Sequence, residues 1–364
     1  RTAMRVLLRL CVIAACLYAA IAAGLYIFQE RLIFLGEPLD KNFKFSFENS
    51  EFAGLANAPE NGVHLDMQAS ATQNSAATSG AANESASAAS AIKENGAAAS
   101  NSAGEIKAGA ETSGFENENT QASTERVGEN AAGNGAAGNN ANAAAIKFQE
   151  INIPFESGSI NGLKFSAAEP KGAILFFHGN FGDVSGWGAY GADFAALGYD
   201  FYIFDYPGYG KSDGKISSQQ QLFASADAMS RYVLAQHSPS KLAMIGYSIG
   251  SGIAAQQAAK WDAARLILLA PYFSFEWLAH EKIPFVPKFL IRYKIPTAEF
   301  LQAARGTQIT LIHGAADELI PVHHSYDLAG FLKAGDLFYE IAAAPHNGLL
   351  AMPGIWEILK ERLR

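Results

Sequence analysis

Three polar residues in the second half of the chain have the types and the order that covalent catalysis needs. Ser248 lies in the pentapeptide 246–250 (GYSIG), Asp317 lies in 313–321 (HGAADELIP), and His346 follows Pro345. A serine hydroxyl is a weak nucleophile at neutral pH, so it needs a base. His346 can take the proton and later deliver it to the leaving group, while Asp317 fixes the imidazole tautomer. These residues predict acyl transfer through a covalent serine intermediate, with Glu318 as the alternative acid.

The residues on either side of the pentapeptide strengthen this interpretation. The pentapeptide continues the apolar run 242–246 (LAMIG) and opens the helix-like stretch 249–260, which is a strand–turn–helix context. Gly246 and Gly250 permit a tight turn that lifts the serine hydroxyl above a sheet. Alone, the five-residue pattern is weak evidence, because it also arises by chance.

An anion-stabilising loop is expected at residues 177–180 (FHGN), directly after the first strand. The backbone N–H groups of Asn180 and Ile249 are the expected oxyanion hole. His178 is expected to order this loop by hydrogen bonding rather than to act as a base.

Alternating strand-like and helix-like segments must position these residues. Continuous apolar runs of this kind are typical of strands covered on both faces. The expected strands are 173–177, 200–206, 242–246, 265–270, 308–313 and 337–341, and the expected helices are 183–197, 217–236, 249–260, 321–332 and 355–364. The pattern predicts an α/β fold with a doubly wound, mostly parallel sheet over residues 146–364, with 151–165 as an antiparallel edge.

The N-terminal region 1–34 is predicted to be a signal anchor. Residues 10–28 carry no charge and are long enough to span a bilayer. Arg1, Arg5 and Arg9 precede them, so the N-terminus is expected in the cytoplasm and the catalytic domain outside, in the periplasm if the cell is bacterial. A cleaved signal peptide with a site at 20–24, and a lipoprotein signal at Cys16, remain alternatives.

Composition separates the middle of the chain from the rest. Residues 69–145 hold 25 alanines and few larger hydrophobic residues, so we expect a disordered insert. The net charge of −8 argues against nucleic-acid binding. This segment carries most of that charge, so the acidity gives no clue to the substrate. The juxtamembrane segment 35–68 contains the aromatic stretch 43–47, which we expect to dock on the domain.

Several other features suggest chemistry that the sequence does not support. Residues 208–212 (GYGKS) lack the first glycine of a phosphate loop, and Asp336 with Glu340 is expected to be solvated surface. The adjacent pair His323-His324 is expected to be a solvated helix start, and no metal or cofactor is expected. With cysteines only at positions 11 and 16, a disulfide framework is excluded as well.

Residues 274–305 lie between two expected core strands and mix apolar side chains with prolines. They are either a small cap that shapes an acyl pocket or touches lipid, or a pair of helices that packs on the sheet.

The chain resembles the α/β-hydrolase superfamily, and within it the membrane-anchored branch of bacterial hydrolases and protein depalmitoylases. The matching stretches are 28–34 (FQERLIF), 176–180 (FFHGN), 205–212 (DYPGYGKS), 246–252 (GYSIGSG), 270–274 (APYFS), the acid loop 313–321 and the pair His346-Asn347. The resemblance implies a serine hydrolase that acts on esters or thioesters without a cofactor.

The sequence departs from the pattern of this family at two places, and two alternative functions remain open. Pro207 stands where arginine is common, and 343–345 (AAP) replaces a glycine-rich approach to the histidine. The same three residues would serve an acyltransferase, and a hydrolase scaffold could also be a non-catalytic tethered binding protein. The expected substrate is a small-molecule or lipid-like acyl ester or thioester, and the oligomeric state is left open.

Overall fold

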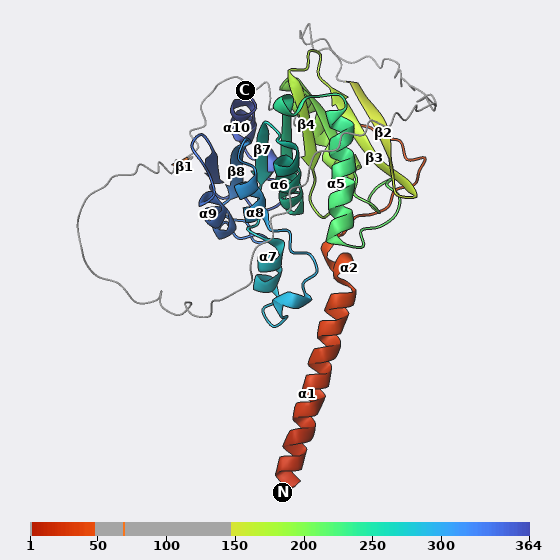
Figure 1. Ribbon diagram of the computed structural model, residues 1–364, viewed down its shortest axis with the longest axis vertical. Helices are drawn as coiled ribbons and strands as arrows, with labels where there is room; N and C mark the ends of the chain where they lie inside the picture. The colour runs from red at the N-terminus through yellow and green to blue at the C-terminus, as the bar shows by residue number, and fades with distance from the viewer. Residues whose placement is uncertain (1, 48–67, 70–146) are drawn as a thin grey trace, which may run out of the picture. The chain divides into compact units, whose positions relative to one another are not determined.

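The computed structural model describes residues 2–47, 68–69 and 147–364 (Figure 1). The predicted disordered insert lies outside the described residues apart from Ala69, and so does most of the juxtamembrane segment beyond position 47.

A single sheet forms the centre of the described domain. Its strand order is β1-β9-β8-β7-β6-β4-β5-β3-β2, and the pairs from β5 through β4, β6, β7 and β8 to β9 are parallel. The hairpin β2–β3 adds an antiparallel edge, as expected, and β1 pairs antiparallel with β9. The strands are β1 (Gln68–Ala69), β2 (Lys147–Phe155), β3 (Gly158–Ser166), β4 (Gly172–Phe177), β5 (Tyr199–Phe204), β6 (Leu242–Tyr247), β7 (Arg265–Leu269), β8 (Gln308–Gly314) and β9 (Leu337–Ile341).

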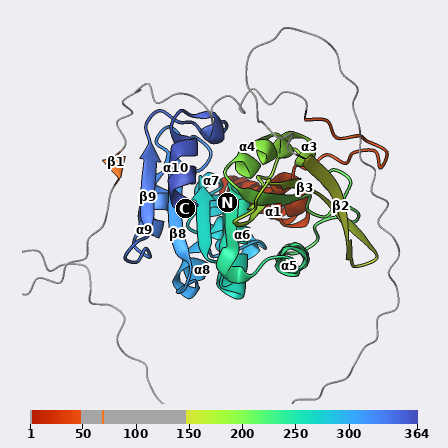
Figure 2. The ribbon, with the colours of Figure 1, turned by 90° about the horizontal axis from the view of Figure 1, so that it is seen from above.

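Helices cover both faces of this sheet, which confirms the predicted α/β class (Figure 2). On one face lie α5 (Gln219–Leu234), α6 (Ile249–Trp261), α8 (Thr297–Ala303) and α9 (His323–Ala329). On the other lie α4 (Gly191–Ala196) and α10 (Ile355–Arg362). The expected helix 183–197 is instead divided into α3 (Val184–Trp187), a 3₁₀ turn (Gly188–Tyr190) and α4. Three glycines within this stretch explain the division, because glycine weakens a helix interior.

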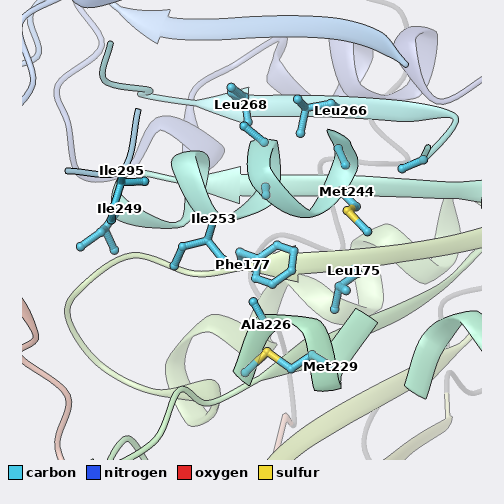
Figure 3. Close-up of a cluster of buried hydrophobic side chains, with 14 of the residues drawn as sticks. Leu175, Phe177, Ala226, Met229, Met244, Ile249, Ile253, Leu266, Leu268 and Ile295 are labelled. Atoms are coloured by element: carbon cyan, nitrogen blue, oxygen red, sulfur yellow. The ribbon is translucent and has the colours of Figure 1, made fainter. Parts of the chain in front are cut away.

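Side chains of the central strands alternate between the two faces. Leu175 and Phe177 of β4 join the cluster under α5 and α6, whereas Ile174 and Phe176 join the cluster under α4 and α10. Figure 3 shows the first cluster, which also includes Met244 of β6 and Leu266 of β7. The runs are continuously apolar because both sets of alternating side chains are buried.

The helix α1 (Thr2–Ile27) is long and apolar enough to cross a membrane by length and composition. It is followed by the short helix α2 (Gln29–Ile33). Further along, Phe47 lies edge-on to Phe165 with ring centroids 5.2 Å apart, and it makes a similar contact with Phe148.

The segment 274–305 forms a short cap. It comprises α7 (Phe275–Lys282), a 3₁₀ turn (Lys288–Leu290) and α8, which packs on α6. The side chains of Phe285 and Phe289 are 56% and 79% exposed, whereas Tyr293 and Ile295 are fully buried. The cap therefore combines a packed half with an apolar exposed half.

The first turn of α6 approaches the end of β4 very closely. A Cβ added to Gly250 would lie 2.1 Å from the carbonyl oxygen of Phe177 and 2.6 Å from that of His178. These are backbone atoms, so no side-chain movement could make room for a methyl group.

We therefore expect Gly250→Ala to lower the free energy of unfolding by about 2–3 kcal/mol, the cost of overpacking a tight contact. A Cβ added to Gly306 would meet no atom within 4 Å, so Gly306→Ala is the matched control, with a change below about 0.5 kcal/mol. Thermal unfolding of both variants measures the difference, and equal midpoints would contradict the close-contact argument.

Candidate active site

The side chains of Ser248, His346 and Asp317 form one hydrogen-bonded chain. His346 Nε2 lies 3.0 Å from Ser248 Oγ, and His346 Nδ1 lies 2.7 Å from Asp317 Oδ2. Each residue is at most 8% exposed. They follow β6, β9 and β8, so the carboxyl ends of parallel strands bring together three residues that are distant in sequence. With the Nδ1 proton donated to the carboxylate, Nε2 is free to accept the serine proton.

Ser248 occupies a sharp turn between β6 and α6. Its φ of 55° and ψ of −122° are unusual for a residue with a side chain, and its N–H donates to Leu269 O at 2.9 Å. Such backbone strain persists only where the surroundings determine it. Here the neighbouring strand and the packed first turn of α6 hold the hydroxyl at the sheet edge.

Four donors surround the carboxylate of Asp317. The backbone N–H groups of Leu319 and Ile320 donate to Oδ1, while His346 and His313 both face Oδ2, at 2.7 and 3.2 Å. Burial raises the pKa of this carboxyl, but the hydrogen bonds from His313 and His346 outweigh burial and lower it below its usual range. Asp317 is therefore ionised at neutral pH. Glu318, the alternative acid, is exposed.

His313 was not among the predicted site residues. Its Nδ1 lies 2.6 Å from Ser325 Oγ, and its Nε2 lies 2.8 Å from Ile320 O. Its Nε2 faces Ile320 O and Asp317 Oδ2 together, which orients the carboxylate. The only sequence signal for a role of His313 was its position near the end of strand β8, four residues before Asp317.

Tyr247, also missed, holds the histidine loop. Its hydroxyl donates to the carbonyl oxygen of His346 and accepts from the N–H of Leu349. The phenol thus links the residue before Ser248 to the loop that carries His346.

The loop after β4 lies beside Ser248, since a Cβ on Gly179 would be 3.8 Å from Ser248 Cβ. Within the described residues, the backbone N–H groups of Asn180 and Ile249 donate to no protein acceptor. Unpaired N–H groups next to a nucleophile are available to an anionic oxygen.

His178 lies behind this loop and is fully buried, with Nδ1 2.8 Å from Gly179 O. Burial lowers the pKa of His178 to about 4 and raises that of the facing Asp205. His178 is therefore neutral at pH 7, and its ring contacts the backbone of the loop through Gly179 O.

Residues 208–212 form a turn after β5, and Lys211 Nζ lies 2.9 Å from Glu150 Oε1. The lysine is thus engaged in an ion pair rather than in a phosphate loop. Asp336 is not solvated surface as expected: it is 9% exposed and accepts from Ile309 N–H at 2.8 Å and Lys333 Nζ at 2.9 Å.

The expectation for His323-His324 is also wrong in part. Helix α9 begins at His323, but His324 is fully buried because the cap covers it. Glu281 Oε2 lies 3.3 Å from Nε2 of each histidine. Because Phe273 N–H donates to His324 Nδ1, the ring proton lies on Nε2 and faces Glu281, which disfavours metal ligation by that atom.

An apolar cavity of about 90 Å³ lies between the end of α1, α2 and the cap. Its walls include Leu25, Tyr26, Leu32, Phe275, Val286 and Leu290. It is separate from the Ser248–His346–Asp317 cluster, since none of those residues lines it.

Comparison with known proteins supports the fold. A family described as Serine aminopeptidase, S33, matches residues 168–306, which include Ser248 but not Asp317 or His346. The alpha/beta hydrolase GrgF from Penicillium sp. sh18 superposes with a TM-score of 0.50 at 14% identity, over 60% of this chain and 97% of that one.

Sequence relatives cover less than half of the chain. The uncharacterized protein Rv2307c of Mycobacterium tuberculosis is 27% identical over 48% of this chain and 63% of its own length. Alpha/beta hydrolase domain-containing protein 17C of Xenopus tropicalis is 28% identical over 46% of this chain and 54% of its own length. The uncharacterized membrane protein YNL320W of Saccharomyces cerevisiae is 26% identical over 46% of this chain and 61% of its own length. The chain thus spans somewhat under two thirds of the length of these relatives.

These findings support the alpha/beta-hydrolase superfamily for this chain, and the fold is the alpha/beta-hydrolase fold. The predicted α/β-hydrolase fold is confirmed, and the chain is similar in sequence to proteins named as alpha/beta hydrolases.

Removing the hydroxyl of Tyr247 tests how the histidine loop is held. We expect Tyr247→Phe to lower kcat for an ester substrate about tenfold with little change in KM, because a misplaced base costs rate rather than binding. Steady-state kinetics measures both constants. A variant with unchanged kcat would show that the loop keeps its position without this hydroxyl.

The burial of His324 predicts a pH-dependent stability. Burial, with His323 acting in the same direction, lowers its pKa to about 4, whereas an unfolded histidine titrates near 6.5. The unfolded state therefore binds the extra proton first, and stability is lost as pH falls from about 6.5 towards 4. The thermal midpoint of His324→Asn should change less across this range than that of the parent. His323→Asn, at a more exposed site, is the control, and identical pH slopes for all three proteins would refute the assignment.

Proposed function

We propose that the chain is a membrane-anchored serine hydrolase of carboxylic esters or thioesters. Ser248 is the nucleophile, His346 the general base and then the general acid, and Asp317 the group that fixes and stabilises the imidazolium. The N–H groups of Asn180 and Ile249 form the oxyanion hole. Attack of Ser248 Oγ on the acyl carbon releases the alcohol or thiol, and water then cleaves the acyl-enzyme.

The observation that carries this proposal is the continuous hydrogen-bonded chain from Asp317 through His346 to Ser248, at 2.7 and 3.0 Å, beside two unpaired N–H groups. Nucleophile, base, orienting acid and anion donors are all needed for acyl transfer. A non-catalytic scaffold has no need to keep all four.

An apolar, membrane-associated acyl substrate fits the surroundings of the domain. Phe285 and Phe289 of the cap are exposed, and the cap borders the apolar cavity at the end of α1. We propose the membrane-anchored branch that includes protein depalmitoylases, in line with stretches such as 28–34 and 176–180.

For the topology, we propose that residues 1–34 are an uncleaved signal anchor and that 146–364 are the catalytic domain. Arg5 and Arg9 lie before the apolar run, which favours a cytoplasmic N-terminus and an outer, periplasmic domain if the cell is bacterial. Residues 35–68 would link the two, and 69–145 would be an insert. The packing of Phe47 on Phe165 supports docking of this link.

Labelling with a fluorophosphonate, which reacts with activated serines, tests the proposal. Ser248→Ala should lose labelling and lower the turnover of p-nitrophenyl esters by on the order of 10⁶, while its thermal unfolding stays close to that of the parent. Ser251→Ala is the matched control, because Ser251 is a buried serine one turn along α6 with no side-chain partner among the described residues.

Labelling or turnover that survives in Ser248→Ala would overturn the assignment of the nucleophile. An unlabelled parent protein that is demonstrably folded would overturn the proposed activity itself.

A further inference from the structure

The stretch that follows the anchor helix lies directly against the expected oxyanion loop. Leu35 N–H donates to Asn180 O at 2.9 Å, and Asn180 Nδ2 donates back to Ile33 O at 3.1 Å. Leu35 also forms a parallel bridge with Phe181. Residues far apart in sequence thus share a short piece of β-like pairing.

A third hydrogen bond fixes the same residue. The hydroxyl of Tyr209 donates to Asn180 O at 2.9 Å, and the backbone N–H of Gly36 faces that hydroxyl. A Cβ on Gly36 would lie 2.2 Å from the Tyr209 ring, so the chain passes flat over the aromatic face only because residue 36 has no side chain. The carbonyl and side chain of Asn180 are therefore held by groups from residues 33–36 and Tyr209.

Further contacts hold both ends of this stretch on the domain. Glu30 pairs with Arg292 at 2.8 Å, and Tyr293 OH donates to Glu30 at 3.2 Å. Beyond the bridge, Leu39 N–H donates to Gly210 O at 2.7 Å. Residues 29–39 are consequently part of the catalytic domain in their contacts, although in sequence they belong to the anchor.

The backbone N–H of Asn180 has no protein partner in the described part of the chain, whereas other polar groups of this residue are engaged. Its carbonyl accepts twice and its amide side chain donates once. An oxyanion donor is effective when it is oriented before the reaction, so that no reorganisation is needed as charge develops.

We infer that residues 29–39 are a positioning element of the oxyanion hole, and that the side chain of Asn180 and the hydroxyl of Tyr209 are positioning groups for the Asn180 N–H. This inference rests on the proposed function, because it requires an oxyanion to form at Ser248. It makes the geometry of the anion site depend on the segment that leaves the membrane anchor.

Asn180→Ala tests the inference, because it keeps the backbone N–H and removes the side chain that donates to Ile33 O. In the full chain in detergent micelles, we expect kcat per fluorophosphonate-titrated serine to fall about 10–100-fold with KM unchanged. Loss of a whole oxyanion donor costs about 10²–10³. A trifluoromethyl ketone forms a hemiketal with an anionic oxygen, so its Ki should rise by the same factor as kcat/KM falls.

Tyr209→Phe is the conservative second variant, since it retains the ring under Gly36 and loses one hydrogen bond to Asn180 O. We expect a fall in kcat of about threefold or more, with a parallel rise in Ki. Lys41→Ala is the matched control: it breaks the exposed Lys41–Asp213 ion pair at 2.8 Å, further along the docked chain, and should leave kcat and Ki within about twofold.

A purely structural contribution would lower the titrated fraction of active protein and the thermal midpoint while kcat per titrated serine and Ki stayed constant, and that result would overturn the inference. If Asn180→Ala does not fold, the same criterion applied to Tyr209→Phe decides the question. Failure of the proposed function is distinguishable, because the parent protein would then show no labelling at Ser248 at all.

Discussion

The backbone contact between α6 and the end of β4 is the constraint on which the site depends. At Gly250, carbonyl oxygens of the neighbouring loop occupy the space that a Cβ would fill. The first turn of α6 therefore rests directly on the backbone of residues 177–178. This contact fixes the position of Ser248 relative to the loop that carries Asn180 without any side chain. Main-chain packing thus places Ser248 beside this loop, whereas the imidazole of His346 and the carboxylate of Asp317 depend on side-chain orientation.

The orientation of His346 and Asp317 comes from neighbouring strands and not from the loops alone. Burying the Asp317 carboxylate costs free energy, and four donors offset that cost. One of them, His313, belongs to strand β8 and is itself fixed by Ser325 of α9. On the other side, Tyr247 of strand β6 holds the carbonyl of His346. Asp317 and His346 are therefore both tied to rigid elements of the sheet, which is the arrangement that keeps the geometry of a site accurate.

Much of this arrangement follows from the sequence, because continuous apolar runs define buried strands and the chemistry lies where each strand ends. Ser248, Asp317 and His346 could be placed together on that ground. His313 and Tyr247 could not, since their importance depends on distances between strands that no local pattern encodes. The burial of His324 was missed for a similar reason: the cap that covers it comes from another part of the chain. Asp336 looked like surface, but an N–H from strand β8 and a lysine enclose it.

The approach to the histidine shows how such a framework tolerates a change in sequence. Ala343 has a φ of 55°, a left-handed conformation that costs an L-residue roughly 1–2 kcal/mol and that glycine adopts freely. The next residue offsets part of this strain: Ala344 is fully buried, its carbonyl accepts from Ala316 N–H at 3.1 Å, and it packs against Gly314 of β8. Beyond it, the carbonyl of His346 is held by Tyr247. Because the loop is fixed on both sides of the strained residue, alanine can stand where the resemblance would place glycine while the imidazole still reaches Ser248.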